Sequence, residues 1–160
     1  EGTVYRPPSE ARSLIIQVTV GCAHNRCTFC NMYRVKKFRV RTKEEIMKDL
    51  DECRDYYGPY VSRVFFADGD ALVVKTELLL ELLAYVHKNF PYVERITSYG
   101  TAKDVLAKSE EDLKALIYSS SVRNKYGWLE TVAANTEDSR WSISERNPAM
   151  TVFWSISIRM

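Results

Sequence analysis

The alternation of apolar and polar residues predicts three strand–helix units in succession along the chain. Short runs of β-branched and aromatic residues indicate buried strands of the kind found in parallel sheets, and they cover residues 14–20, 62–67 and 93–99. Segments with helical periodicity follow each strand, at residues 43–57, 77–90 and 110–118. Because strand and helix alternate in this order, the sequence predicts an α/β fold with a parallel sheet and right-handed crossovers.

Local signals mark where the predicted helices begin and end. Thr42 followed by Glu45 is a capping-box pattern, and a Gly-Pro pair after residue 57 ends the first helix. Thr76 is expected to cap the second helix, and Ser109 with Asp112 to begin the third. The apolar residues of the first helix are expected to form one buried stripe, which comprises Ile46, Leu50, Cys53 and Tyr57.

Polar or glycine-containing loops follow all three predicted strands. A cysteine-rich segment comes after the first strand, the sequence DGDA after the second and SYGT after the third. In parallel α/β folds, ligands bind at the edge where the carboxyl ends of the strands meet. We therefore expect the three loops to converge on one candidate site, to which the third would contribute Ser98, Tyr99 and Thr101.

The regular pattern ends near residue 118. Eight serines and all three tryptophans lie in residues 119–160, against five serines in residues 1–118, and the only strand-like run there is 151–158. A change of this kind is typical of a truncated or out-of-frame segment. We therefore predict that residues 1–118 form one folded unit of βα repeats and that residues 119–160 form an atypical tail.

Composition and charge limit the kinds of partner and the cellular location that we expect for this chain. Apolar residues make up 46% and charged residues 28% of the chain, which is ordinary for a soluble globular protein. The net charge of +2 gives no reason to expect nucleic acid or an anionic membrane as a partner, although residues 34–41 hold five cations. There is no apolar run long enough to span a membrane, and the charged, Pro-Pro-containing start is unlike a signal peptide. We therefore expect a cytoplasmic protein with reduced thiols, so clustered cysteines suggest metal or redox chemistry.

Three of the four cysteines, Cys22, Cys27 and Cys30, lie within nine residues of one another. Thiolates bind zinc or the iron of Fe–S clusters. His24 would complete a four-ligand zinc site, but a single residue separates it from Cys22, which is tighter than the usual spacing. The fourth cysteine, Cys53, falls on the apolar stripe of the first helix and is expected to fill core volume. Three thiolates without a fourth favour a cluster in which one iron is left for an exogenous ligand.

The segment VGCAHNRCTFCNMY, residues 20–33, resembles the cluster-binding loop of radical S-adenosylmethionine (radical SAM) enzymes. In that superfamily three cysteines hold a 4Fe-4S cluster, and the loop follows the first strand of a full or partial (βα) barrel. Phe29 matches the aromatic residue usual before the third cysteine. The first gap is one residue longer than the common spacing, which costs little loop-closure entropy. The resemblance covers about residues 4–118.

The resemblance also implies residues that contact S-adenosylmethionine (SAM). The DGDA loop stands where the family has a GGE-like motif that meets the SAM amino group, which would assign Asp68, Gly69 and Asp70 to cofactor binding. Phe29 and Ser98 are assigned to the same pocket. The alternative for each is an ordinary turn or strand-end role, since Asp-Gly-Asp is also common turn chemistry.

The function implied is reductive cleavage of SAM to a 5′-deoxyadenosyl radical, with an electron donor such as flavodoxin or ferredoxin and an unknown substrate. The expected cofactors are a 4Fe-4S cluster and SAM. The alternative is a non-catalytic iron–sulfur or zinc-binding module, because the chain is short for a complete barrel.

Overall fold

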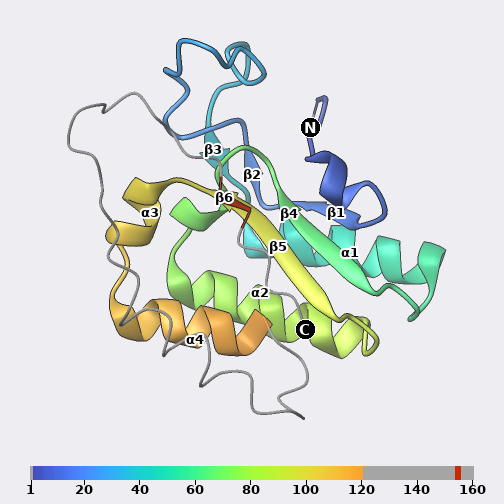
Figure 1. Cartoon of the computed structure of the whole chain (residues 1–160). Helices are drawn as coiled ribbons and strands as arrows, with labels where there is room; N and C mark the ends of the chain where they lie inside the picture. The colour runs from blue at the N-terminus through green and yellow to red at the C-terminus, as the bar shows by residue number, and fades with distance from the viewer. Residues whose placement is uncertain (1, 121–153, 156–160) are drawn as a thin grey trace.

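The computed structural model describes residues 2–120 and the pair 154–155, which together form a small α/β unit (Figure 1). Its elements along the chain are η1 (Pro8–Glu10), β1 (Leu14–Gln17), β2 (Thr19–Val20), β3 (Arg39–Val40), α1 (Lys43–Tyr57), β4 (Arg63–Ala67), η2 (Ala71–Val73), α2 (Thr76–Asn89), β5 (Arg95–Gly100), α3 (Ala102–Leu106), α4 (Glu110–Ser120) and β6 (Trp154–Ser155).

The sheet has the order β1-β4-β5-β6, with β4 between two parallel neighbours. β1 pairs parallel with β4 in the register Leu14↔Val64, and β4 pairs parallel with β5 in the register Val64↔Ile96. β6 pairs antiparallel with the end of β5. The predicted α/β fold with a parallel sheet of βα units is therefore confirmed, and the three parallel strands of the described residues do not close into a barrel.

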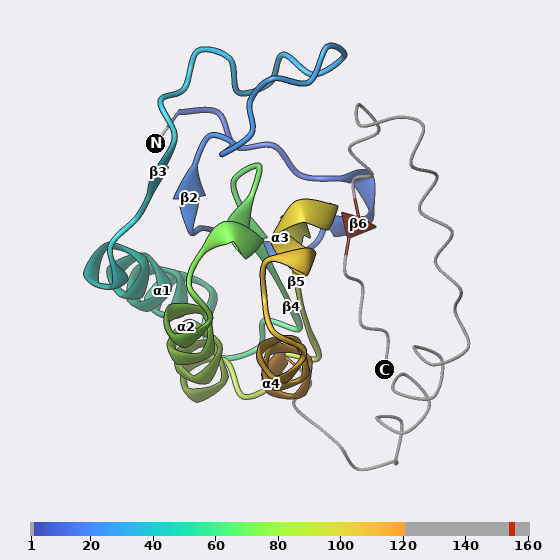
Figure 2. The same ribbon diagram turned by 90° about the vertical axis from the view of Figure 1, so that its left-hand side faces the viewer.

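The hydrophobic core lies between the sheet and its helices. Figures 1 and 2 show α1, α2 and α4 on one face of the strands. Ile16, Val64 and Ile96 project from the three parallel strands into this core and are almost completely buried. Since a fully buried aliphatic side chain stabilises the folded state by about 1.5–3 kcal/mol, this layer holds the sheet edge in place.

The predicted first strand, residues 14–20, is divided between two sheets. Up to Gln17 the chain pairs with β4, and from Thr19 it pairs antiparallel with β3 instead. Val18 joins the two parts: its N–H donates to the carbonyl of Ala67, and its own carbonyl accepts from Arg41 N at 3.0 Å. The β2–β3 ribbon therefore leads the chain out of the parallel sheet just before the first cysteine.

The predicted capping box of α1 is confirmed, but its predicted buried stripe ends one turn earlier than expected. The Thr42 hydroxyl accepts from Glu45 N at 3.2 Å, and the Glu45 carboxylate accepts from Thr42 N at 2.7 Å. Leu50 is fully buried and Cys53 packs partly against the core, but Tyr57 is 57% exposed. The prediction that Tyr57 is buried was wrong, because the last turn of α1 extends beyond the core.

The other helix starts agree in part with the sequence. Ser109 Oγ accepts from Asp112 N at 3.0 Å, as expected for the start of α4. Thr76, expected as the cap of α2, is its first helical residue; Lys75 is the N-cap, and Thr76 Oγ1 faces Lys108 Nζ at 3.3 Å. The short helix α3 was not expected.

The N-terminal segment crosses the face of the sheet opposite to the helices (Figure 2). There, Glu10 is almost fully buried, and its carboxylate accepts from Arg95 Nη2 at 2.9 Å on β5 and from Ser13 Oγ at 2.5 Å. This contact closes the second face of the sheet over the start of β5.

The strand expected near the C-terminus and the predicted domain boundary both concern residues after 118. The expected strand at 151–158 lies outside the described residues, except for the two residues of β6. The domain boundary at 118 stays a prediction for the same reason. Within the part that the structure describes, no helix is long and apolar enough to cross a membrane.

Candidate cysteine-loop site

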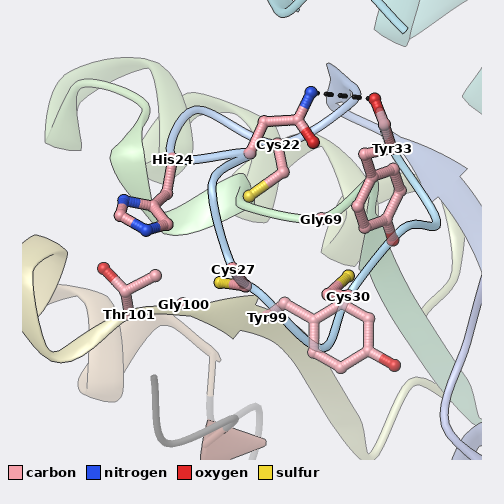
Figure 3. Close-up of a pocket in the computed structure, with 10 residues that line it drawn as sticks. Cys22, His24, Cys27, Cys30, Tyr33, Gly69, Tyr99, Gly100 and Thr101 are labelled. Atoms are coloured by element: carbon pink, nitrogen blue, oxygen red, sulfur yellow. Dashed lines mark hydrogen bonds between the residues drawn. The ribbon is translucent and has the colours of Figure 1, made fainter. Parts of the chain in front are cut away.

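The three predicted loops meet at one pocket at the carboxyl edge of the parallel strands (Figure 3). The cysteine loop, defined here as residues 21–38, forms one wall, and the ends of β4 and β5 form the other. The lining residues are Cys22, His24, Asn25, Cys27, Cys30, Tyr33, Gly69, Tyr99, Gly100 and Thr101. The convergence follows from topology, because the carboxyl ends of parallel strands lie side by side.

All three loop cysteines are half-buried and none forms a disulfide. Burial raises the pKa of Cys22 above its ordinary value, so this thiol stays protonated until a metal displaces the proton. No three His, Cys, Asp or Glu side chains of the described residues are grouped as the ligands of a single metal ion.

The three thiols of the loop could hold either a single zinc ion or an iron–sulfur cluster, and the two differ in how far apart they place their ligands. Zn–S bonds of about 2.3 Å would bring thiolates on one zinc ion to within about 4 Å of each other. A cluster places its own iron and sulfide atoms between its ligands, so its thiolates stand farther apart. Three unbridged thiols around one pocket therefore fit a cluster in number and type.

Side chains within the loop hold its backbone in place. Asn25 Nδ2 donates to the Tyr33 carbonyl at 2.9 Å, which joins the two limbs of the loop (Figure 3). The Arg34 guanidinium donates to the carbonyls of Cys27 at 3.0 Å and Cys30 at 3.3 Å. Arg34 therefore shapes the turn between the second and third cysteines, while Asn25 holds the two limbs together; neither role was expected from the sequence.

Asp68 ties both limbs of the loop to the end of β4. Its side chain is completely buried, and Oδ2 accepts from Lys36 Nζ at 2.7 Å, from Gly21 N at 3.1 Å and from Gln17 Nε2 at 3.3 Å. Gly69 N also donates to the Gly21 carbonyl at 3.1 Å. Gly21 precedes the first cysteine and Lys36 follows the third, so one carboxylate fixes the entry and exit of the loop.

Asp70 forms a second carboxyl group under the pocket wall. Burial, together with a hydrogen bond to Asp104, raises the pKa of Asp70 to about 8. Asp104 itself belongs to the capping box of α3, where its carboxylate accepts from Thr101 N at 2.8 Å. Burial and the nearby Asp104 carboxylate thus favour the protonated form of Asp70, because two like charges at this separation repel.

Tyr33 packs closely over Gly69. A Cβ atom on Gly69 would lie 2.5 Å from the Tyr33 ring, so only glycine fits there. The Tyr33 hydroxyl, Asp68 Oδ1 and Asp70 Oδ1 are buried without a hydrogen-bond partner in the described part of the chain. Burial and the nearby Asp68 carboxylate raise the pKa of Tyr33, so its hydroxyl remains a donor. Buried polar atoms without partners at a pocket are candidates for ligand contacts.

The structure brings together only part of the predicted site. Gly69 and the three cysteines line the pocket, while Asp68 and Asp70 lie buried beside it. Phe29 is 63% exposed and Ser98 is half-buried within β5, and neither lines the pocket. Tyr99 and Thr101 do so in place of Ser98. His24 also lines the pocket, whereas Cys53 lies on α1 against the core.

A parallel βα sheet with a three-cysteine loop at the carboxyl end of its first strand places the chain among α/β proteins with a thiol-lined pocket at this edge of the sheet. The family model of the radical SAM superfamily matches residues 16–132, and the chain belongs to this superfamily. The match runs past the predicted boundary at residue 118. Neither a curated protein nor a solved structure matches the chain. Members of the superfamily generally use a 4Fe-4S cluster and SAM.

Proposed function

We propose that the chain binds a 4Fe-4S cluster through Cys22, Cys27 and Cys30 and takes part in the reductive cleavage of SAM. The observation that carries this proposal is the pocket itself: three unbridged thiols of a radical SAM chain line one cavity with Gly69, just after β4, and Gly100, at the end of β5. When bound, the cluster supplies one electron to the SAM sulfonium, which yields methionine and a 5′-deoxyadenosyl radical.

The thiols and their supports have distinct roles in this proposal. Three thiolates leave one iron open for a ligand that is not protein. The Arg34 and Asn25 hydrogen bonds hold the loop backbone in shape before the cluster arrives, which lowers the entropy cost of binding. Lys36 and Asp68 hold the loop against the sheet. Half-burial of the cysteines limits the access of water to the site.

The second wall of the pocket suits the amino-acid end of SAM. An ammonium group requires oxygen acceptors, and Asp68 Oδ1 and Asp70 Oδ1 are buried acceptors without a partner in the described residues. Gly69 and Gly100 present backbone without a side chain, which permits close approach. We therefore assign ammonium recognition to the DGDA loop. Asp68 and Asp70 lie buried beside the pocket and are assigned on their unpartnered acceptors; Phe29 and Ser98, which also do not line the pocket, remain sequence predictions.

The test is anaerobic reconstitution with iron and sulfide, followed by EPR spectroscopy of the reduced protein with and without SAM. We expect about four irons per chain, a cluster signal that changes when SAM is added, and 5′-deoxyadenosine as a product. Alanine at Cys22, Cys27 or Cys30 should abolish iron loading, while Cys53→Ala is the matched control that should keep it.

A non-catalytic cluster module is the second candidate, and the open sheet of the described residues, with three parallel strands, favours it. It predicts a loaded cluster without 5′-deoxyadenosine and without a SAM-dependent EPR change. Colourless protein that holds only zinc would contradict both cluster proposals.

A further inference from the structure

The cysteine loop and its flanks carry positive charge without any acidic residue. Residues 18–43 contain seven lysines and arginines and neither aspartate nor glutamate, although the whole chain has a net charge of only +2. Four of these seven cations are compensated by carboxylates from other segments. The pairs are Lys36–Asp68, Arg39–Glu45, Arg41–Asp49 and Lys43–Glu81.

The three remaining cations lie on the cysteine loop itself. Arg26, Arg34 and Lys37 are exposed and form no ion pair with the described residues. Two large apolar side chains on the same loop are also exposed, Phe29 at 63% and Val35 at 96%. We call these five residues the cationic rim. Aromatic and arginine side chains are both enriched in protein interfaces relative to the rest of the surface.

We propose that the cationic rim is the docking surface for an acidic one-electron carrier protein in its reduced state. The inference rests on the proposed function, in which each SAM cleaved consumes one electron from outside the chain. The half-buried thiols belong to the loop that forms the rim, so a cluster held by them lies close to this surface. In the transfer, the carrier is oxidised by one electron and the cluster is reduced by one; no bond or proton is exchanged.

Charge and surface chemistry favour an acidic protein as the partner that binds the cationic rim. Uncompensated cations around the entry point steer an acidic partner and raise its association rate by about 10- to 1000-fold at low salt. Phe29 and Val35 offer apolar area that an interface would bury. Nucleic acid is the other polyanion to consider, but its binding typically uses about 6–10 phosphate contacts. The rim has three uncompensated cations, which is too few for such a surface.

The experiment compares the wild-type chain with the double variant Arg26→Glu/Lys37→Glu. Arg34 is left unchanged because it also holds the loop carbonyls. The matched control is Arg63→Glu/Lys88→Glu, which reverses two exposed cations outside the cysteine loop. Arg63 is the first residue of β4, and Lys88 lies in the last turn of α2. Stopped-flow spectroscopy follows reduction of the reconstituted cluster by reduced flavodoxin, and in parallel by dithionite.

With flavodoxin, we expect the rim variant to react about tenfold more slowly than wild type at about 50 mM salt, and the wild-type rate to fall as salt increases. Dithionite is a small anion that needs no docking surface, so its reaction with the rim variant should slow far less, and the control variant should behave as wild type. Equal flavodoxin rates for rim variant and wild type would overturn the docking proposal. So would an equal loss with dithionite, which would point to damage of the loop.

A second measurement separates this proposal from the proposed function. Flavodoxin binding to the cluster-free chain, measured by surface plasmon resonance, requires the rim but no cluster. If the chain fails to load iron but binds flavodoxin more weakly after Arg26→Glu/Lys37→Glu, the docking surface stands and the cluster function fails. Tighter binding of a 20-nucleotide single-stranded RNA than of flavodoxin to the wild-type chain would assign the rim to nucleic acid and overturn the proposal.

Discussion

The contact between Lys36 and Asp68 leads to the sharpest prediction, made by the substitution Lys36→Met. Methionine keeps most of the length and apolar volume of the lysine side chain but removes its ammonium group. Asp68 has no exposed surface, so its carboxylate cannot replace the lost ion pair with water. The hydrogen bonds from Gly21 N and Gln17 Nε2 to the same oxygen remain.

The expected loss of stability follows from these contacts. Removing one partner of a buried ion pair costs about 3–5 kcal/mol, because the other charge is left uncompensated. The two remaining donors to Asp68 place the loss at the lower end, about 3 kcal/mol. That is a large part of the 5–15 kcal/mol typical of a folded domain, and it corresponds to a fall in Tm of about 10 °C.

Urea unfolding of the cluster-free, reduced protein, followed by circular dichroism, measures this loss. Lys37→Met is the matched control, because Lys37 is the adjacent lysine, is exposed and has no carboxylate partner in the described residues. The double variant Lys36→Met/Asp68→Asn should recover at least 1 kcal/mol, since a neutral amide no longer needs the ammonium. The reaction of the loop thiols with a disulfide reagent should also become faster in Lys36→Met. If Lys36→Met loses no more stability than Lys37→Met, the contact does not hold the loop.

Three further substitutions test other contacts in cluster-free protein by urea unfolding. Thr42→Ala removes the capping box of α1 and should lower the free energy of unfolding by about 1 kcal/mol; an unchanged value would argue against the cap. Gly69→Ala places a methyl group 2.5 Å from the Tyr33 ring and should cost about 1–3 kcal/mol; an unchanged free energy of unfolding would argue against this close packing. Asp70 has a pKa of about 8 in the folded chain, against about 4 when unfolded, so the unfolded chain binds fewer protons between these values and stability falls as pH rises. Asp70→Asn removes this titrating group, so the free energy of unfolding of the variant, relative to wild type, should rise from about pH 4 to pH 8. A pH-independent difference would contradict the raised pKa of Asp70.

Much of the fold was predictable because its signals are local. The strands at the core are short apolar runs, and the capping residues of α1 lie three positions apart in sequence. The helix α3 was missed because its five residues are too few to show a period, although Thr101 and Asp104 form a capping-box pattern. The division of the first strand at Val18 was not predictable, since it depends on pairing with β3, about twenty residues away.

The candidate site was likewise predictable only in part. The three cysteines and the DGDA loop are close in sequence to the strand ends that place them, so strand order sufficed to predict that they meet. The contact of Lys36 with Asp68 joins residues 32 positions apart, and it depends on the path of the whole cysteine loop. The effect of Asp104 on the pKa of Asp70 similarly requires α3 to fold back beside η2.

The N-terminal contact of Lys36 has a practical consequence for purification. Lys36 Nζ donates to the Thr3 carbonyl at 2.5 Å, so the first residues of the chain run beside the cysteine loop. A polyhistidine tag joined to Glu1 would begin two residues from that carbonyl and carry several imidazoles to the thiols. Imidazole binds zinc, nickel and iron, so tag-borne metal would enter every measurement of metal content. A tag without histidine or cysteine at this end would keep iron and zinc assays specific to the protein's own ligands.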